Sequence, residues 1–533
     1  MRHFIYLIFC FQFLFGFAQL PVKDWHHHDF SDTSFSGIST YKTYQYIGDK
    51  KPQKKVIVAV IDGGTDHKHE DLKSVLWINK NEIINNGIDD DKNGYIDDIH
   101  GWNFLGGKNG DVEFEQLQYT RTYSQLRTKY EGKEQSQIEK KDLKEYQHFL
   151  LCKEKHLKEL EEKKQDKIYF GKLFSSMQIV VKEIGVEDPS LEQIEKYKSE
   201  DEMKMIAKKR LLKYVKRDGS VRPIFKKVEE MFMDADSAFK YHLNPYYNAR
   251  LLIGDNPMDY TERNYGNNHY DGPEATHGTA VAGCIAAQRD NTIGMEGISN
   301  NSEIMILRAV PNGDERDKDI ANSIRYAVDN GASIINMSFG KRMYDQPEIV
   351  EEAFRYAISK DVLLVHAAGN DGDYIDKEIH FPNNRFSKTQ KEIPNLITVG
   401  ASDFKSNPAS FSNYGPKSVD VFAPGKDVYT CFPGSKYDYI SGTSFACPVT
   451  TGVAALLRAY FPELSAAEIK KVILKSVNKI DKKVPLPSDE TKLVKFNKLC
   501  KTGGVIDTYN AFLLAEKMYN KKINSSKKAK GKF

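Results

Sequence analysis

The clearest hydrophobic pattern in the sequence is a set of short, unbroken apolar runs that alternate with segments of helical spacing. Four runs rich in valine, isoleucine and leucine have this form: residues 56–61, 304–309, 332–337 and 362–366. A short continuous run of this kind indicates a strand that is buried on both faces. The segments 318–330 and 347–359, which lie between such runs, have helical patterns. We therefore predict an α/β fold with a doubly wound, mostly parallel sheet and helices on both faces.

The pattern changes between residues 111 and 250. Lysine and glutamate become dense there, glycine becomes scarce, and apolar residues recur at helical spacing: Leu143, Tyr146, Leu150, Leu157 and Leu160. This combination predicts a mainly helical, charged insertion with one solvated face. The insertion could be solvent-facing structure without chemistry, a lid, or an arm on which a partner docks. It divides the predicted α/β domain into two parts, residues 55–110 and 251–516.

The two ends of the chain have patterns of their own. Residues 2–17 combine Arg2 with an apolar stretch, and small residues precede a cleavage position after Ala18. This pattern predicts a signal peptide over residues 1–18, and hence export to the periplasm, the cell surface or the medium. Residues 19–54 are predicted to be a lead-in to the first strand. The basic tail, residues 517–533, lacks a hydrophobic pattern and is predicted to be disordered.

Composition narrows the function classes. The 533 residues are 28% charged and 40% hydrophobic, which is typical of a globular protein. The net charge of +3 is too close to zero to indicate nucleic-acid binding, and no apolar segment is long enough for a comfortable membrane span. Five cysteines follow the predicted signal peptide, an odd and sparse set that does not form a disulfide framework. Two of them, Cys284 and Cys447, are expected to be buried small side chains.

Four polar residues stand where the predicted elements begin or end. Asp62 follows the first strand, Asn370 follows the run at 362–366, and His277 and Ser444 each open a helix of small residues. Such positions gather at one edge of a parallel sheet. Each residue alone is more often structural, as a cap or turn. Together they supply a nucleophile, a base, an orienting carboxylate and a hydrogen-bond donor for an oxyanion, the set that acyl transfer requires.

An acidic loop lies between residues 89 and 98. It offers oxygen ligands in the spacing with which an EF-hand calcium loop begins, namely Asp89, Asp91, Asn93, the Tyr95 carbonyl and Asp97. His100 stands where the bidentate glutamate of that loop would be, so a two-helix EF-hand is not expected. A stand-alone Ca²⁺ loop and an acidic Asn-Gly turn remain open as alternatives.

The motifs around these residues resemble those of the subtilisin-like serine peptidases, the subtilases. The resemblance rests on VIVAVIDGG, HGTAVAG, AAGNDGD and SGTSFACPVTTGVAALL, and on NMSFG (336–340) and FSNYGP (411–416). It spans about residues 56–110 and 265–514. The triad order along the chain, Asp then His then Ser, is that of subtilisin. The 215 residues between Asp62 and His277 (277 − 62) are more than a compact member has, and the predicted insertion accounts for the excess.

The resemblance implies a role for each residue. Ser444 would be the nucleophile, His277 the general base and then acid, and Asp62 its orienting partner, while Asn370 and the Ser444 N–H would bind the oxyanion. An extended peptide or protein substrate would lie in a cleft lined by Ser338, Phe339, Gly340, Ala367, Ala368 and Gly369. Members often carry Ca²⁺, which favours the calcium interpretation of the acidic loop, although the chemistry itself needs no cofactor.

Two departures from the family pattern are visible, Ala280 in place of a second histidine and Phe445 in place of a common methionine. Neither position carries the implied proton transfers, so activity is expected. The sequence thus predicts an exported serine endopeptidase. Two alternatives are a catalytically silent binding module and a processing protease of narrow specificity whose insertion restricts access. Oligomeric state and side-chain preference do not follow from the sequence.

Overall fold

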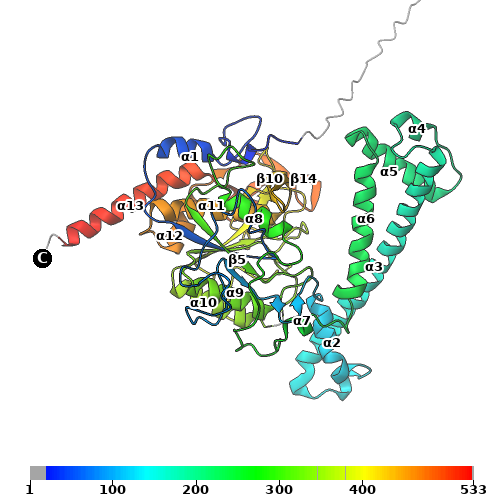
Figure 1. Cartoon of the computed structure of the whole chain (residues 1–533), viewed down its shortest axis with the longest axis horizontal. Helices are drawn as coiled ribbons and strands as arrows, with labels where there is room; N and C mark the ends of the chain where they lie inside the picture. Colours follow the sequence, from blue (N-terminus) through cyan, green and yellow to red (C-terminus); the bar gives the residue numbers. More distant parts are fainter. Residues whose placement is uncertain (1–19, 345, 379, 531–533) are drawn as a thin grey trace, which may run out of the picture. The chain divides into compact units, whose positions relative to one another are not determined.

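The computed structural model describes residues 20–344, 346–378 and 380–530, and the chain forms two compact units (Figure 1). The α/β unit consists of Val22–Leu160 and Ala238–Phe533, and the helical unit of Glu161–Ser237. The sequence predicts one insertion over residues 111–250. The structure differs, because its two ends, residues 111–160 and 238–250, belong to the α/β unit.

A nine-stranded sheet forms the centre of the α/β unit. Its strand order is β12-β15-β9-β8-β7-β6-β1-β5-β2, and every neighbouring pair is parallel except β12 with β15. The strands, in chain order, are β1 (Val56–Asp62), β2 (Gly101–Asn103), β5 (Ser302–Arg308), β6 (Ile334–Met337), β7 (Leu363–Ala367), β8 (Leu396–Ser402), β9 (Val421–Pro424), β12 (Asn478–Lys479) and β15 (Gly504–Val505). The predicted parallel, doubly wound α/β fold is confirmed.

Burial explains the unbroken apolar runs. In β1, which lies between β5 and β6, every residue except Ile57 is buried. Val58 is paired with Ile304 on one side and with Ile334 on the other. A strand that is covered on both faces has no solvent-facing positions, and its sequence therefore shows no polar alternation.

Helices cover both faces of the sheet (Figure 1). Two apolar clusters occupy the two faces. One includes residues of α8 (Thr276–Ala286), α11 (Thr443–Tyr460), α12 (Ala466–Lys475) and α13 (Thr508–Lys530). The other includes residues of α9 (Asp317–Asp329) and α10 (Pro347–Ser359), which pack against each other. The small residues of α8 allow close approach: a Cβ on Gly278 would lie 2.1 Å from the Gly64 carbonyl oxygen. This contact brings the start of α8 against the end of β1.

The remaining elements of the α/β unit are short or lie at its margin. They are α1 (Thr40–Ile47), β3 (Gly106–Gly107), β4 (Gly110–Asp111), α2 (Gln118–Tyr130), α7 (Arg250–Ile253), β10 (Val428–Phe432), β11 (Lys436–Ile440), β13 (Lys483–Leu486) and β14 (Asp489–Lys495). Helix α2 packs with the first turns of α3 (Leu143–Ile184) through an aromatic cluster that includes Tyr123, Tyr130 and Phe149. This packing joins residues 118–160 to the α/β unit.

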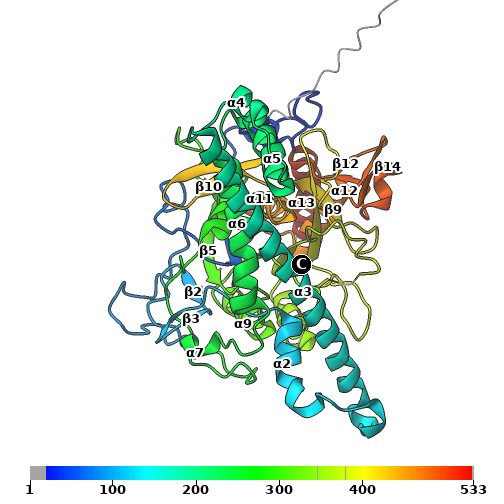
Figure 2. The same ribbon diagram turned by 90° about the vertical axis from the view of Figure 1, so that its right-hand side faces the viewer.

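The helical unit has an apolar core of its own. The later part of α3 packs with α4 (Leu191–Lys196), α5 (Glu202–Asp218) and α6 (Arg222–Ser237), as Figure 2 shows. Met177, Leu211 and Ile224 are among the buried residues, and charged side chains cover the outside. The predicted helices of the insertion are therefore present, with the predicted solvated face.

The C-terminal segment differs from the sequence prediction. Residues 517–530, predicted to be disordered, continue α13 as far as Lys530. Neither glycine nor proline interrupts this stretch, and lysine and alanine are good helix formers, so a helix that starts on the core can propagate through it.

The predicted signal peptide, residues 1–18, lies outside the described residues. In the part of the chain that the structure describes, no helix is both long enough and apolar enough to cross a membrane.

Candidate active site

The structure joins the first two of the four predicted residues directly. Asp62 is the last residue of β1 and is buried, and His277 is the second residue of α8. The Nδ1 atom of His277 lies 2.8 Å from Asp62 Oδ1 and 3.0 Å from Oδ2. A carboxylate can only accept, so Nδ1 carries the proton and Nε2 is left free to act as a base.

Charge at this pair affects the protonation of the imidazole. Burial disfavours the charged ring, but the Asp62 carboxylate outweighs it and Glu274 adds to the effect, so the pKa of His277 lies above its usual value. The ring also lies against Phe445, with the ring centroids 5.4 Å apart. Phe445, the departure noted in the sequence, therefore packs on the face of the base without taking its hydrogen-bonding atoms.

Ser444 lies at the start of α11, directly after the helix N-cap Gly442 and Thr443. Its hydroxyl donates a hydrogen bond of 3.2 Å to the Ser338 carbonyl, and its own carbonyl accepts one of 2.8 Å from the Ser338 hydroxyl. Both Ser444 and His277 are described, and no hydrogen bond joins them. A looser serine–histidine geometry is common when no substrate is bound, so this arrangement is compatible with a nucleophile and base that align on binding.

Asn370 follows β7, and its amide orientation is fixed by one neighbour. The Oδ1 atom accepts hydrogen bonds from the backbone N–H of Thr443 at 2.8 Å and from the Thr443 hydroxyl at 2.9 Å. Because the backbone N–H can only donate, the oxygen must be the atom on that side. The Nδ2 group lies on the side of Gly442, 3.6 Å from where a Cβ on that glycine would be. A hydrogen-bond donor is thus directed to the start of α11.

The six predicted substrate-binding residues surround one cavity of about 540 Å³. Ser338, Phe339 and Gly340 line it after β6, and Ala367, Ala368 and Gly369 line it at the end of β7, together with Asn370 and Ser444. His366 stabilises the first wall through a 2.8 Å bond from Nε2 to the Phe339 carbonyl. Burial lowers the pKa of His366 to about 4, so the ring is neutral at pH 7.

Sequence reasoning missed the residues that the insertion adds to this cavity. Leu117 and Tyr119, at the beginning of α2, and Glu159 of α3 line it as well. Their helical spacing in the sequence is that of ordinary packing residues, so no local signal distinguishes them. Only the packing of residues 113–160 on the α/β unit brings these side chains to the cavity.

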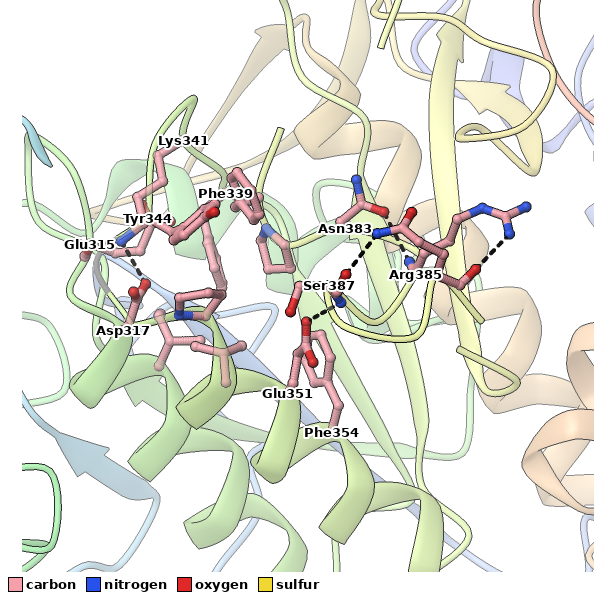
Figure 3. A pocket seen from close by; sticks show the side chains of 16 residues that line it. Glu315, Asp317, Phe339, Lys341, Tyr344, Glu351, Phe354, Asn383, Arg385 and Ser387 are labelled. Atoms are coloured by element: carbon pink, nitrogen blue, oxygen red, sulfur yellow. Dashed lines mark hydrogen bonds and ion pairs between the residues drawn. The ribbon is translucent and has the colours of Figure 1, made fainter. Parts of the chain in front are cut away.

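A second, smaller cavity of about 200 Å³ lies beside Phe339 and Lys341 (Figure 3). Phe339 and Phe354 line it, and the buried Lys341 ammonium binds the Asp317 carboxylate at 2.7 Å at one end. The residues that line it do not include Asp62, His277 or Ser444. This cavity therefore adjoins the substrate wall without containing a catalytic group.

The acidic loop has a geometry that differs from the prediction. The carboxylates of Asp89 and Asp97 accept hydrogen bonds from backbone N–H groups, at 2.8 Å from Gly94 and 2.9 Å from Gly87 respectively. Of the predicted ligands Asp89, Asp91, Asn93, Tyr95 and Asp97, only Asp91 belongs to a cluster of ligand atoms.

That cluster consists of Glu82, Asp91 and Asp98, with one ligand atom of each within 4.8 Å of the others. Asn79 Nδ2 bridges Asp91 at 3.0 Å and Asp98 at 2.7 Å. Burial raises the pKa of Asp98 to about 6. Glu82 and Asp98 lie outside the predicted set because the sequence pattern does not show which carboxylates the loop turns inward.

The five described cysteines are all buried and free. Burial raises the pKa of Cys284 and of Cys447 to about 12, so both thiols are protonated and unreactive at neutral pH. The Cys447 thiol donates to Asn336 at 3.2 Å, in the packing between α11 and β6. Both cysteines therefore have the structural place expected for them.

Comparison with known sequences identifies the family. The profile of the subtilase family matches residues 53–498. The thermophilic serine proteinase of Bacillus sp. (strain AK1) is 37% identical over 242 residues, which cover 43% of this chain and 56% of that protein. Thermitase of Thermoactinomyces vulgaris is 36% identical over 205 residues, 38% of this chain and 68% of thermitase. The chain thus spans about half the length of the first of these relatives.

Solved structures include two similar chains. The prenylagaramide maturation protease PagA is 30% identical, with a TM-score of 0.37, over 45% of this chain and 82% of that one. The subtilase cytotoxin SubAB gives 25% identity and a TM-score of 0.39, over 46% and 78% of the two chains. The family assignment rests on the sequence profile, which covers far more than half of the chain and includes Asp62, His277, Asn370 and Ser444. The chain belongs to the subtilase family.

Proposed function

We propose that this protein is an exported serine endopeptidase that hydrolyses peptide bonds through an acyl-enzyme intermediate. The observation that carries the proposal is the 2.8 Å contact between His277 Nδ1 and Asp62, with Ser444 and Asn370 on the adjoining cavity. The serine proteinases among the relatives support the same reaction class. Export is supported by the apolar N-terminal pattern of the sequence.

The proposed reaction follows from the chemistry of each group. His277 Nε2 takes the proton of the Ser444 hydroxyl as the oxygen attacks the peptide carbonyl, and Asp62 stabilises the imidazolium that forms. Asn370 Nδ2 and the Ser444 N–H, at the positive end of the α11 dipole, donate to the oxyanion. The imidazolium then gives its proton to the leaving amine. Water, deprotonated by the same base, releases the acid and restores Ser444.

A narrow-specificity processing protease is the second candidate, and one observation favours it. Tyr119 and Glu159 of the insertion line the cavity that contains Ser444, so the insertion can restrict what enters. Cleavage of unfolded casein, compared with cleavage of a panel of folded proteins, would separate the two candidates. A general endopeptidase degrades casein at many sites, whereas a processing protease leaves casein largely intact and cuts a folded client once.

Ca²⁺ at the acidic loop is a separate proposal. Glu82, Asp91 and Asp98 fit a hard cation, because three carboxylates converge and burial already makes the charge on one of them unfavourable. Bound there, the ion would neutralise the cluster and stabilise the loop that ends at β2. It would take no part in the peptide-bond chemistry.

The experiment that tests the main proposal is hydrolysis of casein by the wild-type protein and by Ser444→Ala. Release of peptides by the wild type and none by a folded Ser444→Ala variant is the expected result. Equal release by both variants would contradict a serine mechanism. A folded wild type that neither cleaves casein nor reacts with a fluorophosphonate would instead support the silent binding module.

A further inference from the structure

A groove of about 380 Å³ runs beside the catalytic histidine, separate from the cavity that contains Ser444. Asp62 and His277 line one end of it. Its two sides are residues 310–313, which follow β5, and residues 338–340, which follow β6 and also line the Ser444 cavity. The two hollows therefore share one wall and are lined by different members of the catalytic set.

The insertion supplies part of this groove. The Glu113 carbonyl accepts a hydrogen bond of 2.8 Å from Asn312 N–H, and Glu115 N–H donates one of 2.9 Å to the Asn312 carbonyl. Phe114 and Asn312 thereby form a parallel bridge. The backbone of Glu113 is fixed against one side of the groove by these bonds, and the Glu113 side chain is among those that line it.

The exposed charges in the groove are negative. Glu113 and Glu274 are exposed, whereas the other carboxylates that line it, Asp62 and Glu315, are buried. Asp62 is taken up by His277. Glu274 lies close enough to His277 to raise its pKa, and one Glu274 oxygen accepts from Thr276 N–H at 2.6 Å. The other Glu274 oxygen and the Glu113 carboxylate have no printed ion-pair partner that would neutralise them.

Arg308 is the strongest cation in the wall, and its guanidinium is already committed. It donates to the Gly63 carbonyl at 2.8 Å, to Asn103 Oδ1 at 3.0 Å and to the Val112 carbonyl. Burial lowers its pKa to about 10, against the opposing effect of Asp111 and Glu113, so it stays charged at neutral pH. Because it is buried and fully bonded, Arg308 organises the wall and offers no donor to a ligand.

The geometry of an extended substrate determines which of its residues meets this groove. Successive side chains of an extended chain point to opposite sides. If the residue that supplies the attacked carbonyl directs its side chain into the Ser444 cavity, the preceding residue directs its side chain to the opposite side, where His277 and the groove lie. We call that preceding residue P2.

We propose that the groove beside His277 selects substrates with lysine or arginine at P2, and that Glu113 of the insertion and Glu274 are the residues that recognise it. This inference rests on the proposed peptidase function and names a substrate class for it. A basic P2 side chain would extend along the groove with its cation between the two carboxylates. An acidic P2 side chain would be repelled by both.

The test uses internally quenched peptides that are identical except at P2, which is lysine, alanine or glutamate, with the cleaved bond located by mass spectrometry. The wild type is expected to cleave the lysine peptide with kcat/KM about tenfold above that of the glutamate peptide, since each exposed carboxylate contributes a few-fold. The ratio should fall as NaCl is raised from about 0.05 to 0.5 M, because exposed charges are screened.

Variants assign the effect to the two residues. The double variant Glu113→Gln/Glu274→Gln is expected to reduce the lysine-to-glutamate ratio to about one or two, and Glu113→Lys to favour the glutamate peptide. Glutamine keeps an oxygen to accept from Thr276 N–H, so the start of α8 is preserved. Glu200→Gln, an exposed residue of the helical unit, changes the net charge equally and should leave the ratio unchanged.

Each outcome has a definite meaning. Equal cleavage of the three peptides by the wild type, or a preference that the double variant retains, overturns the inference while the cleavage itself upholds the peptidase function. If no peptide is cleaved and a fluorophosphonate does not label Ser444, the proposed function fails and the inference fails with it. A preference for lysine that is lost only in the groove variants supports both.

Discussion

Arg121 of α2 donates a hydrogen bond of 2.7 Å from Nη1 to the backbone carbonyl of Asp314, at the edge of the substrate groove. The same buried guanidinium reaches the Glu315 carbonyl at 3.2 Å. Residues 310–315 thus depend on a side chain from the insertion for part of their hydrogen bonding. The insertion is therefore a structural component of the groove edge, in addition to carrying the separate helical unit.

Replacing Arg121 should weaken the groove edge. In Arg121→Met, buried carbonyls lose their donor, which should lower the free energy of unfolding by about 2–4 kcal/mol. We also expect kcat/KM to fall about tenfold or more for a peptide that extends along residues 310–315, and much less for a small ester. Thermal denaturation and steady-state kinetics would measure both effects.

The exposed Arg210→Met of α5 is the matched control for Arg121→Met, because it removes the same side chain without removing a buried donor. It should match the wild type in both assays. Equal losses on the long peptide and on the small ester would contradict the positioning role of Arg121 and leave only an effect on stability.

Asn370 should act mainly on the chemical step. Because Oδ1 is bound by Thr443, the Nδ2 group is the part available to an oxyanion, and Asn370→Ala should reduce kcat about 10²–10³-fold with little change in KM. Asn370→Asp keeps the acceptor for Thr443 but removes the donor, and should lose at least as much. Activity of Asn370→Asp near the wild-type level would contradict the oxyanion role.

The pH profile should reflect the raised pKa of His277. The base must be neutral to accept a proton, so kcat/KM should rise with pH and reach half of its maximum above pH 6.5. Glu274→Gln removes one of the charges that favour the imidazolium, and should move this midpoint to lower pH. Asp62→Asn should move it further in the same direction and reduce kcat on the order of 10⁴-fold. A midpoint that neither substitution moves would contradict the assigned electrostatics.

Calcium should stabilise the fold through the acidic loop. Adding Ca²⁺ to metal-free protein should raise Tm, because a ligand that binds only the folded state shifts the unfolding equilibrium. Asp91→Asn should abolish that shift, since it removes a cluster carboxylate, while Asp89→Asn should weaken the loop without abolishing the response. An identical Ca²⁺ response in Asp91→Asn would place the ion elsewhere.

The sequence was sufficient to predict the elements whose pattern is dictated locally. The unbroken apolar runs of β1, β5, β6 and β7 follow from burial on both faces, and each is found within two residues of its predicted position. The four polar residues that were singled out do lie at strand ends and helix starts, because a parallel sheet collects its carboxyl ends at one edge.

What depended on distant packing could not be predicted. The division of the insertion between two units follows from contacts such as Arg121 with Asp314, which join residues almost two hundred positions apart. The ligand atoms of the acidic loop depend on backbone N–H groups that hold Asp89 and Asp97. The continuation of α13 depends on a helix that starts on the core, whereas the sequence of residues 517–530 has no hydrophobic pattern.

The central claim is that Ser444 is a nucleophile activated by His277, and its most direct test is covalent labelling by a fluorophosphonate, followed by peptide mapping. The account predicts a single phosphonyl group on Ser444 in the wild type. It predicts none in Ser444→Ala and a strongly slowed reaction in His277→Ala, with all three proteins folded. A folded wild type whose Ser444 stays unlabelled, or labels as fast in His277→Ala, would contradict it.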